Sequence, residues 1–234
     1  GTTFLEKLLC YCNYVNLQTS PLRKFKYQVT HSHEINDKMF YKLNKKKTFL
    51  KTHSHYNQNF LNIAKKNNFR IIVIIRNLND MLLSRYFYIK NDKNHWDFKN
   101  LQNLDFENGF IHSINSAHPE DNIPVYIYYK KWIEEWQKNY KKHDVLLLKY
   151  EDLVFNEKEF CKKVLDYINC SDIKLDKFLS RISNFKNSDA KKRWRRFGYL
   201  KYTYRKGIIN EHKKIFTSKI YKSIDIINHT FNKK

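Results

Sequence analysis

The sequence predicts an α/β protein in which a central parallel β-sheet is flanked by helices on both faces, and two observations lead to this fold class. Short apolar runs alternate with amphipathic helical patterns along the 234 residues, which is the order of elements that builds a parallel sheet. The chain is 41% hydrophobic and 16% aromatic and contains only 4 Gly and 3 Pro, so a disordered or fibrous chain is excluded. Its length suits one domain with a sizeable core.

The first half of the chain contains two strand candidates, each followed by a helix. Residues 48–52 are a short strand candidate, and a helical pattern follows at 58–66. Residues 70–76 contain the continuous β-branched run IIVII, which is typical of a strand buried on both sheet faces. Asn79 or Asp80 can then cap a helix that runs through residue 87.

The second half repeats this order. Residues 144–149 form an apolar strand candidate, a helix is expected over about 156–168, and an aromatic-rich amphipathic helix is expected at 126–142. No internal repeat or domain boundary is visible. In open α/β sheets, ligands bind beyond the carboxyl ends of the strands. The residues that follow each apolar run are therefore the candidates for chemistry.

The net charge of +22 has two interpretations. It could serve a polyanionic partner, such as nucleic acid, an anionic membrane surface or a phosphate-rich cofactor. It could also be a solvated, Lys-rich surface that reflects a general composition bias. The Lys residues are scattered along the chain rather than confined to one block, which favours the second interpretation. We therefore expect no nucleic-acid partner.

The cysteines and the lack of long apolar runs bear on the compartment. Cys10, Cys12, Cys161 and Cys170 include no C-x-x-C pair. The sequence shows neither a secretory h-region nor an apolar run of membrane-spanning length. We expect reduced thiols and a cytoplasmic protein.

The chain starts with Gly1-Thr2-Thr3 ahead of an amphipathic helix. Free backbone N–H groups and the helix dipole at such a start attract an anion. The same residues also suit an ordinary capped helix. A nucleotide-kinase P-loop would carry Gly-Lys-Ser/Thr at this point, and its absence disfavours a P-loop kinase.

Lys51-Thr52-His53 closes the first strand candidate. A His at the carboxyl end of a strand can accept a proton from an attacking hydroxyl, and a nearby Lys can neutralise charge on a transferring group. The H-x-H pairs His31/His33 and His53/His55 could instead bind a metal ion, but no obvious third carboxylate or thiolate ligand accompanies them. We therefore expect no metal.

Two basic motifs could hold phosphate. Arg76 closes the β-branched run, and Ser84 lies one to two turns into the following helix, so both could converge on one phosphate. Arg205-Lys206-Gly207 sets two cations beside a Gly that permits close backbone approach to an anion.

In order along the chain, these motifs resemble those of the cytosolic-type sulfotransferases, which depend on 3′-phosphoadenosine 5′-phosphosulfate (PAPS). Gly1-Thr2-Thr3-Phe4 is similar to the second half of the family's Lys-Ser-Gly-Thr-Thr-Trp loop, and Lys51-Thr52-His53 matches its Lys-Thr-His. The family's Arg-Asn-x-x-Asp-x-x-x-Ser element is matched by Arg76, Asn77, Asp80 and Ser84. Its Tyr-Glu-Asp and Arg-Lys-Gly motifs are matched by Tyr150-Glu151-Asp152 and Arg205-Lys206-Gly207.

The resemblance implies a single-domain, P-loop-like fold and an enzyme that transfers a sulfuryl group in line from PAPS. The acceptor would be a hydroxyl or amine of a small molecule or carbohydrate, the product would be 3′,5′-ADP, and no metal would be needed. Such transfer requires in-line positioning and cations around the equatorial oxygens. His53 matches the family's base and Lys51 its adjacent cation. The alternative is a non-catalytic relic of the same fold that binds a nucleotide or a polyanion.

The resemblance also implies which residues bind the nucleotide. Gly1, Thr2 and Thr3 would donate to the 5′-phosphosulfate. The 3′-phosphate would be held by Arg76, Ser84, Arg205, Lys206 and Gly207. The adenine would contact Phe4, Tyr150, Ser183 and Phe185.

The chain departs from the family pattern at several positions. Phe4 stands where Trp is usual, Ser183 where Thr is usual, and Ser54-His55 where the family has Leu-Pro. His212 takes the place of a Trp that usually follows Arg-Lys-Gly, and Lys222 replaces an acidic residue of the common C-terminal dimer motif. Dimerisation by that motif is therefore not expected.

The family's loop Lys and Ser, and the strand that leads to them, would lie before Gly1. Residues 1–234 are therefore expected to be a sulfotransferase domain without that strand and the first half of the loop. We expect such a chain to be poorly soluble or inactive, because a missing strand leaves an open sheet edge. Restoring roughly 10–20 upstream residues should recover both properties.

The acceptor cannot be read from the sequence, since its pocket would come from variable loops at 19–34, 91–108 and 187–203. The basic cluster at 191–196 lies in the last of these loops. It could capture an acidic acceptor or PAPS, or it could be a solvated loop. A basic patch with an embedded aromatic is also used by proteins that bind single-stranded nucleic acid.

Overall fold

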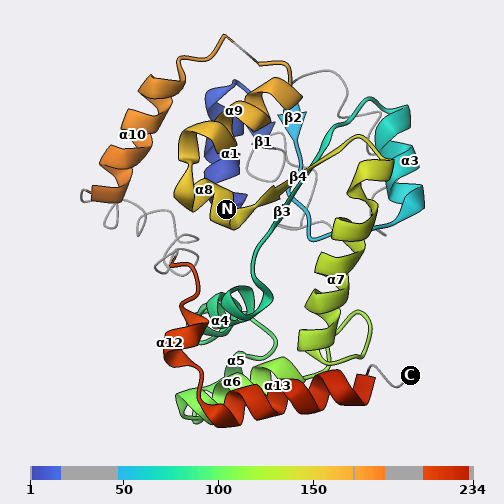
Figure 1. The fold of residues 1–234 in the computed structure, drawn as a ribbon, viewed down its shortest axis with the longest axis vertical. Helices are drawn as coiled ribbons and strands as arrows, with labels where there is room; N and C mark the ends of the chain where they lie inside the picture. The colour runs from blue at the N-terminus through green and yellow to red at the C-terminus, as the bar shows by residue number, and fades with distance from the viewer. Residues whose placement is uncertain (1, 17–46, 171, 188–207, 232–234) are drawn as a thin grey trace. The chain divides into compact units, whose positions relative to one another are not determined.

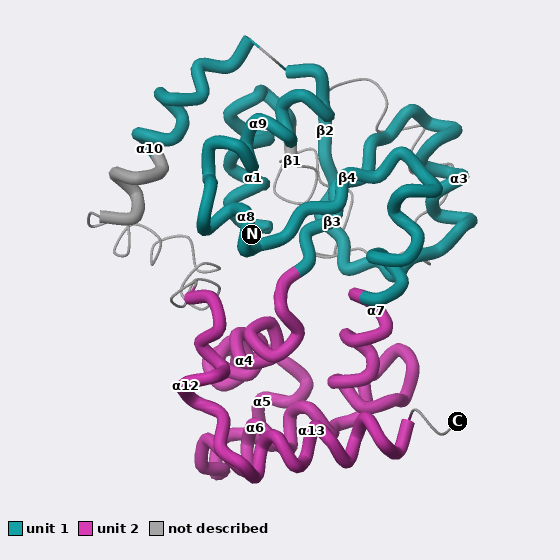
Figure 2. Tube along the Cα trace, in the orientation of Figure 1, with its two compact units in different colours: residues 1–75, 134–184 teal, residues 76–133, 185–234 magenta. Residues whose placement is uncertain are grey.

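A computed structural model describes residues 2–16, 47–170, 172–187 and 208–231 (Figure 1). The chain forms two compact units, each built from two segments that are distant in the sequence (Figure 2). Unit 1 comprises Gly1–Ile75 and Glu134–Asn184, and unit 2 comprises Arg76–Ile133 and Phe185–Lys234.

Unit 1 contains the strands found in the described part of the chain, and these form two parallel pairs. β3 (Ile71–Ile75) pairs with β4 (Val145–Lys149), from Ile71 opposite Val145 to Ile75 opposite Lys149. β1 (Val15–Asn16) pairs with β2 (Thr48–Phe49). The β-branched run and the later apolar run are therefore strands as predicted, each within one residue of the expected bounds. The strand predicted at 48–52 was too long, because only Thr48 and Phe49 form the ladder.

Helices surround these strands in unit 1, and their ends follow from local side-chain chemistry. They are α1 (Thr2–Tyr11), α3 (Gln58–Lys66), α8 (Tyr150–Phe155), α9 (Glu157–Tyr167) and α10 (Leu175–Asn187). Asn57 caps α3 by accepting from the backbone N–H groups of Asn59 and Phe60 at 2.9 and 3.1 Å, and Asn156 caps α9 by accepting from the N–H of Glu159. The helix predicted at 58–66 is confirmed, and the one predicted at 156–168 is α9.

Asparagine performs the backbone role that glycine usually has in helix ends. Each described non-glycine residue with a positive φ is Asn, at positions 13, 68, 122, 169 and 210. Asn68 and Asn169 lie two residues beyond the last residues of α3 and α9, where the left-handed conformation terminates a helix. Asn tolerates this conformation better than other side chains. A chain with 4 Gly can therefore still end its helices sharply.

The core of unit 1 joins α1 to the helices that follow β4. Leu8, Leu9 and Cys12 of α1 pack with residues of β4, α8, α9 and α10. Phe4 meets Phe160 and Phe178 edge to face, with ring centroids 6.1 and 5.7 Å apart. Such aromatic pairs add to the stabilisation from burial alone. The position of α1 is thus fixed by its apolar face.

Unit 2 is helical. Its elements are α4 (Leu78–Ile89), α5 (Phe98–Leu101), α6 (Phe106–Asn115), α12 (His212–Ile215) and α13 (Ser218–Phe231). Helix α7 (Val125–Asn139), which the short helix η2 (Tyr140–Lys142) follows, begins in unit 2 and ends in unit 1. Together α7 and η2 occupy the segment predicted as one helix at 126–142. Helices α5, α6, α8, α10, α12 and α13 were not predicted.

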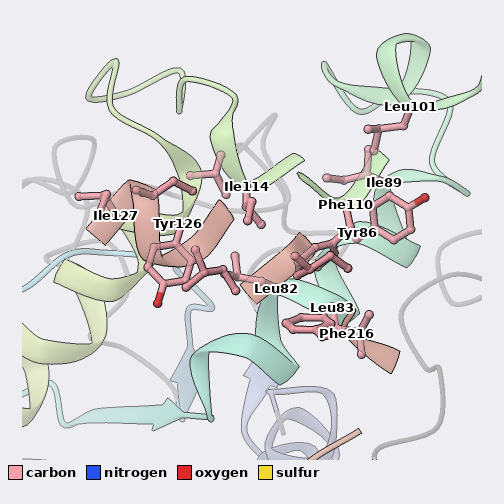
Figure 3. Close-up of a cluster of buried hydrophobic side chains, with 14 residues drawn as sticks. Leu82, Leu83, Tyr86, Ile89, Leu101, Phe110, Ile114, Tyr126, Ile127 and Phe216 are labelled. Carbon is pink, nitrogen blue, oxygen red and sulfur yellow. The ribbon is translucent and has the colours of Figure 1, made fainter. Parts of the chain in front are cut away.

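Aromatic and aliphatic side chains from α4, α5, α6, α7 and α13, together with Phe216, form the core of unit 2 (Figure 3). Tyr86 and Phe110 are almost fully buried in it, with ring centroids 5.9 Å apart. Gly109 of α6 lies against Tyr86, and a Cβ added there would meet the Tyr86 hydroxyl oxygen at 2.9 Å. Glycine therefore allows α4 and α6 to approach closely.

The N-cap of α4 differs from the prediction. Asn77, rather than Asn79 or Asp80, caps the helix, because its side chain accepts from the Asp80 N–H at 3.2 Å and the helix begins at Leu78. The Asp80 carboxylate instead accepts hydrogen bonds from residues more than 100 positions later in the chain.

Among the described residues, no helix has the length and apolarity to cross a membrane.

Candidate functional site

Helix α1 presents its first turn as the candidate anion site. Thr2 and Thr3 are its first residues, and Thr2 is exposed. The N–H groups of a first turn have no acceptor within the helix, and the helix dipole is positive there. Phe4 is half-buried and packs on Phe160 and Phe178. Gly1 lies outside the described residues.

Lys51 lies beside α1. Its ammonium nitrogen is 3.9 Å from the carboxylate of Glu6, one turn along the helix from Thr2 and Thr3. Lys51 follows β2 by two residues, and His53, whose side chain is exposed, lies two residues further on. The structure therefore brings two sequence motifs together in unit 1, since the pairing of Lys51 with Glu6 joins the second motif to the helix of the first.

Two contacts fix the backbone on either side of His53. The indole N–H of Trp136 donates to the carbonyl oxygen of Ser54 at 3.2 Å, and both residues are buried. The Ser54 hydroxyl donates to the hydroxyl oxygen of Thr52 at 3.0 Å. His53 is exposed, while the residues on either side of it make these contacts.

The residues after Ser54 contact the end of α7 and the segment beyond it. His55 Nδ1 lies 3.5 Å from the carboxylate of Glu135, and the Tyr56 hydroxyl lies 2.9 Å from His143 Nε2. The Tyr56 ring meets the Trp136 ring edge to face at 5.7 Å. Ser54 and His55, which stand where the family has Leu-Pro, thus contact Trp136 and Glu135 within unit 1.

Tyr150 begins α8 directly after β4. It is half-buried and packs against the core of unit 1. Ile75 and Lys149 are register partners at the carboxyl ends of β3 and β4. Each is followed in the sequence by a predicted binding residue, Arg76 after Ile75 and Tyr150 after Lys149.

In unit 2, Arg76 and Asp80 form the candidate phosphate region together with Ser84. The Arg76 guanidinium donates to the carbonyl oxygen of Ile208 at 2.8 Å and lies 3.9 Å from the Asp80 carboxylate. Ser84 is the seventh residue of α4 and is half-buried. Asp80 and Ser84 are four residues apart, so they lie on one face of the helix.

Asp80 is a buried carboxylate with three hydrogen bonds from one segment. It is 1% exposed and accepts from the backbone N–H groups of Asn210 and His212 at 2.6 and 3.1 Å. Its Oδ1 also lies 2.8 Å from His212 Nδ1. Burial by itself raises the pKa of Asp80, but these hydrogen bonds outweigh burial and lower that pKa below its ordinary value.

The comparisons with known proteins agree with these motifs. The sulfotransferase domain family matches residues 1–233. The chain belongs to the sulfotransferase family. A comparison with curated protein sequences finds no match.

Solved structures show the same fold. Mouse sulfotransferase SULT7A1 complexed with PAP is similar with a TM-score of 0.60 and 17% identity, over 97% of this chain and 79% of that one. Retinol dehydratase in complex with androsterone and inactive cofactor PAP gives a TM-score of 0.56 and 16% identity, over 98% and 77% of the two chains. The α/β fold class predicted from the sequence is confirmed by these neighbours and by the parallel strand pairs.

Several predicted residues of this sulfotransferase-family chain lie outside the structural description. Arg205, Lys206, Gly207, His31, His33 and the cluster at 191–196 are not among the described residues, nor are the side chains of Ser183 and Phe185 on α10. Their roles stay predictions. Within the described ranges, no group of three or more His, Cys, Asp or Glu side chains could hold a metal ion.

Sequence reasoning missed the residues that hold the candidate site residues in place. Trp136 is 82 positions from Ser54, and His212 is 132 positions from Asp80. His212 stood out only as a departure from the family's Trp. The pattern of 126–142 predicted an aromatic-rich amphipathic helix but could not indicate the hydrogen-bond partner of Trp136.

Proposed function

We propose that the chain binds PAPS and transfers its sulfuryl group to a hydroxyl or amine of a small-molecule or carbohydrate acceptor. The observation that carries the proposal is the pairing of Lys51 with Glu6 of α1. It puts the segment of Lys51 and His53 beside the helix that begins with Thr2 and Thr3. Membership of the sulfotransferase family and the PAP named in the neighbouring structures support the same nucleotide.

The residues of unit 1 suit the sulfuryl end of PAPS. The backbone N–H groups at Thr2 and Thr3, and Gly1 before them, would donate to the 5′-phosphosulfate, because a helix start favours anions. Lys51 would stabilise charge on the transferring group. His53 would accept the proton of the acceptor as the acceptor's oxygen or nitrogen bonds to sulfur. The sulfur–oxygen bond to the 5′-phosphate would break, and 3′,5′-ADP would leave.

The residues of unit 2 suit a second phosphate. Arg76 and Ser84 would hold the 3′-phosphate together with Arg205, Lys206 and Gly207. Charge-assisted bonds from a guanidinium are stronger than bonds between neutral groups. The adenine would lie against Phe4 and Tyr150, with Ser183 and Phe185 as its further contacts. No metal ion has a role in this proposal.

A thermal-shift titration with two nucleotides tests the assignment of the 3′-phosphate. The product 3′,5′-ADP should raise the melting temperature more than 5′-AMP does. Arg76→Ala should remove most of the difference, since a hydrogen bond to a charged group contributes about 1.5–3 kcal/mol. Arg85→Ala, on the helix α4 that follows Arg76, is the matched control and should retain the difference. Equal shifts from both nucleotides in the unaltered protein would contradict the proposal.

A second measurement separates catalysis from binding. Formation of 3′,5′-ADP from PAPS should depend on an added acceptor, and a panel of a phenol, a sugar and a primary amine would identify the class. Binding of 3′,5′-ADP without turnover by any acceptor would favour the non-catalytic alternative instead.

A further inference from the structure

The Asp80 carboxylate fixes the segment that follows the Arg-Lys-Gly motif. Among the described residues, its hydrogen-bond donors belong to Asn210 and His212, which come three and five residues after Gly207. A carboxylate that is 1% exposed is costly to bury unless donors compensate it. Asp80 and this segment therefore hold each other in one arrangement.

Arg76 holds the same segment at its other end. Its guanidinium donates to the carbonyl oxygen of Ile208, the residue directly after Gly207. Arg76 and Asp80 are four residues apart and pair at 3.9 Å. Residues 76–80, which lead into the first turn of α4, thus contact both Ile208 and Asn210, and they include the guanidinium assigned to the 3′-phosphate.

The backbone of the segment is shaped for this contact. Asn210 has a φ of 57°, so the chain turns there, and the N–H of Lys213 donates to the Asn210 carbonyl oxygen at 3.1 Å. The turn aims the N–H groups of Asn210 and His212 at the carboxylate of Asp80. Those N–H groups are thereby committed to Asp80, and they do not serve as donors to a ligand.

His212 extends the contact into the core of unit 2. It is 5% exposed, its Nδ1 lies 2.8 Å from Asp80 Oδ1, and its ring lies 5.7 Å from that of Phe216. His212 begins α12. The Asp80 carboxylate therefore joins the start of α4 to the start of α12.

We propose that Asp80 is a positioning residue for recognition of the 3′-phosphate, acting through Arg76 and the segment after Gly207. The inference rests on the proposed function. Asp80 does not contact the nucleotide in this proposal. It sets the arrangement of groups that do, so its loss should weaken recognition of the 3′-phosphate and leave binding of the rest of the nucleotide unchanged.

Dissociation constants for 3′,5′-ADP and 5′-AMP test this role. Asp80→Asn keeps the size of the side chain but replaces an acceptor oxygen with an N–H donor that would face the donors of Asn210 and His212. We expect it to weaken 3′,5′-ADP binding about 10-fold or more, with 5′-AMP binding within about 2-fold, as loss of one charge-assisted contact would produce.

A pair of His212 variants separates the effect of the hydrogen bond to Asp80 from the effect of ring packing against Phe216. His212→Phe keeps a ring beside Phe216 and the backbone N–H but removes the Nδ1 donor, and should lose part of the discrimination between the two nucleotides. His212→Asn carries an amide N–H close to the position of Nδ1 and should restore it. These variants decide the question if Asp80→Asn does not fold, because discrimination at the unaltered level in His212→Phe would then overturn the inference.

Asp97→Asn is the matched control. Asp97 is a fully buried carboxylate in the same unit, with partners Asn100 and His112 rather than the segment at 208–212. It should lower stability and keep the discrimination. An equal loss of discrimination in Asp97→Asn and Asp80→Asn would reduce Asp80 to a structural role.

The outcomes distinguish a failure of the proposed function from a failure of the role inferred for Asp80. If the unaltered protein does not discriminate 3′,5′-ADP from 5′-AMP, the proposed function fails and the inference fails with it. If it discriminates and Asp80→Asn discriminates equally well, the inference alone is overturned.

Discussion

Trp136 donates its indole N–H to the carbonyl oxygen of Ser54, the residue that follows His53. Trp136 is 2% exposed and Ser54 is 6% exposed, so the bond lies away from solvent and holds the backbone beside the proposed base. A base must be within hydrogen-bond reach of the proton that it accepts. We therefore expect the contact between Trp136 and Ser54 to affect turnover, although neither residue touches the substrate in the proposed mechanism.

Trp136→Phe should lower turnover more than it weakens nucleotide binding. The variant keeps an aromatic ring against Tyr56 and removes the donor to Ser54. We expect a loss of about 0.5–1.5 kcal/mol in the free energy of unfolding, a lower kcat, and an unchanged dissociation constant for 3′,5′-ADP. Trp132→Phe, the same change one helical turn earlier, is the control. A kcat equal to that of the unaltered protein would show that Trp136 does not position His53.

His53→Ala should lower turnover by roughly 10²–10⁴-fold, the usual range for a positioned general base. Its effect on 3′,5′-ADP binding should be small, because the proposed role of His53 concerns the acceptor. Both quantities are measured by steady-state kinetics and calorimetry. His55→Ala is the companion variant, since His55 pairs with Glu135. If His53→Ala retains full turnover and His55→Ala loses it, His55 is the base.

Gly109→Ala should destabilise unit 2. The new methyl group would meet the Tyr86 hydroxyl oxygen at 2.9 Å and a ring carbon at 3.2 Å. Overpacking of this kind costs about 1–3 kcal/mol, which exceeds the gain of about 0.5–1 kcal/mol from replacing Gly with Ala in a helix. Denaturant unfolding would measure the difference.

Tyr86→Phe should rescue that variant. No partner for the buried Tyr86 hydroxyl lies within hydrogen-bond distance among the described residues, so its removal should cost little by itself. In a double-mutant cycle, the two changes together should be more stable than the sum of the single effects predicts. Additive free energies would contradict the close contact between Gly109 and Tyr86.

His95 should make stability depend on pH. Burial, and then the positive charge of Arg85, lower the pKa of His95 from 6.5 to about 4, with His118 acting in the same direction and Asp97 and Asp92 opposing it. The unfolded chain therefore binds a proton between pH 6.5 and about 4 that the folded chain does not. The contribution of neutral His95 to the free energy of unfolding is therefore fully present above pH 6.5, and it is lost as the pH falls towards 4.

His95→Asn isolates this effect. The Asn oxygen can still accept the Asp97 N–H that donates to His95 Nδ1, but the side chain does not titrate. Free energies of unfolding measured from pH 7.5 to 4.5 should agree at the high end and diverge in favour of the variant at the low end. Parallel curves would show that His95 titrates normally in the folded protein.

The sequence predicted those features that depend on neighbouring residues. The run Ile71–Ile75 is β-branched throughout, and α3 has an Asn at its start, so one strand and one helix could be placed closely. The N-cap of α4 could not, because Asn77, Asn79 and Asp80 are all side chains that cap helices. The distant partners of Asp80 decide between them, and no local pattern encodes a contact across 130 positions.

The sequence predicted which residues to consider for the candidate site, but it did not predict the residues that contact them and hold them in place. Local motifs predicted Lys51, His53, Arg76 and Ser84 as site residues, and their roles stay predictions. Glu6 and Trp136 contact the segment of Lys51 and His53, and His212 contacts Asp80 between Arg76 and Ser84, so two of these motifs have partners from distant parts of the chain. Such pairings depend on the packing of α1, α7 and α12, which the sequence pattern alone did not give.

The interleaved segments of the two units have a consequence for synthesis on the ribosome. The chain leaves unit 1 after Ile75 and returns at Glu134, so β3 emerges long before its partner β4 at Val145–Lys149. At about 5–20 residues per second, the residues between them take roughly 3–14 s to translate. During that interval, the run Ile71–Ile75 has no β4 to pair with, which is the condition under which nascent chains aggregate. Chaperone binding should therefore be strongest for nascent chains from which residue 75 has emerged and residue 149 has not.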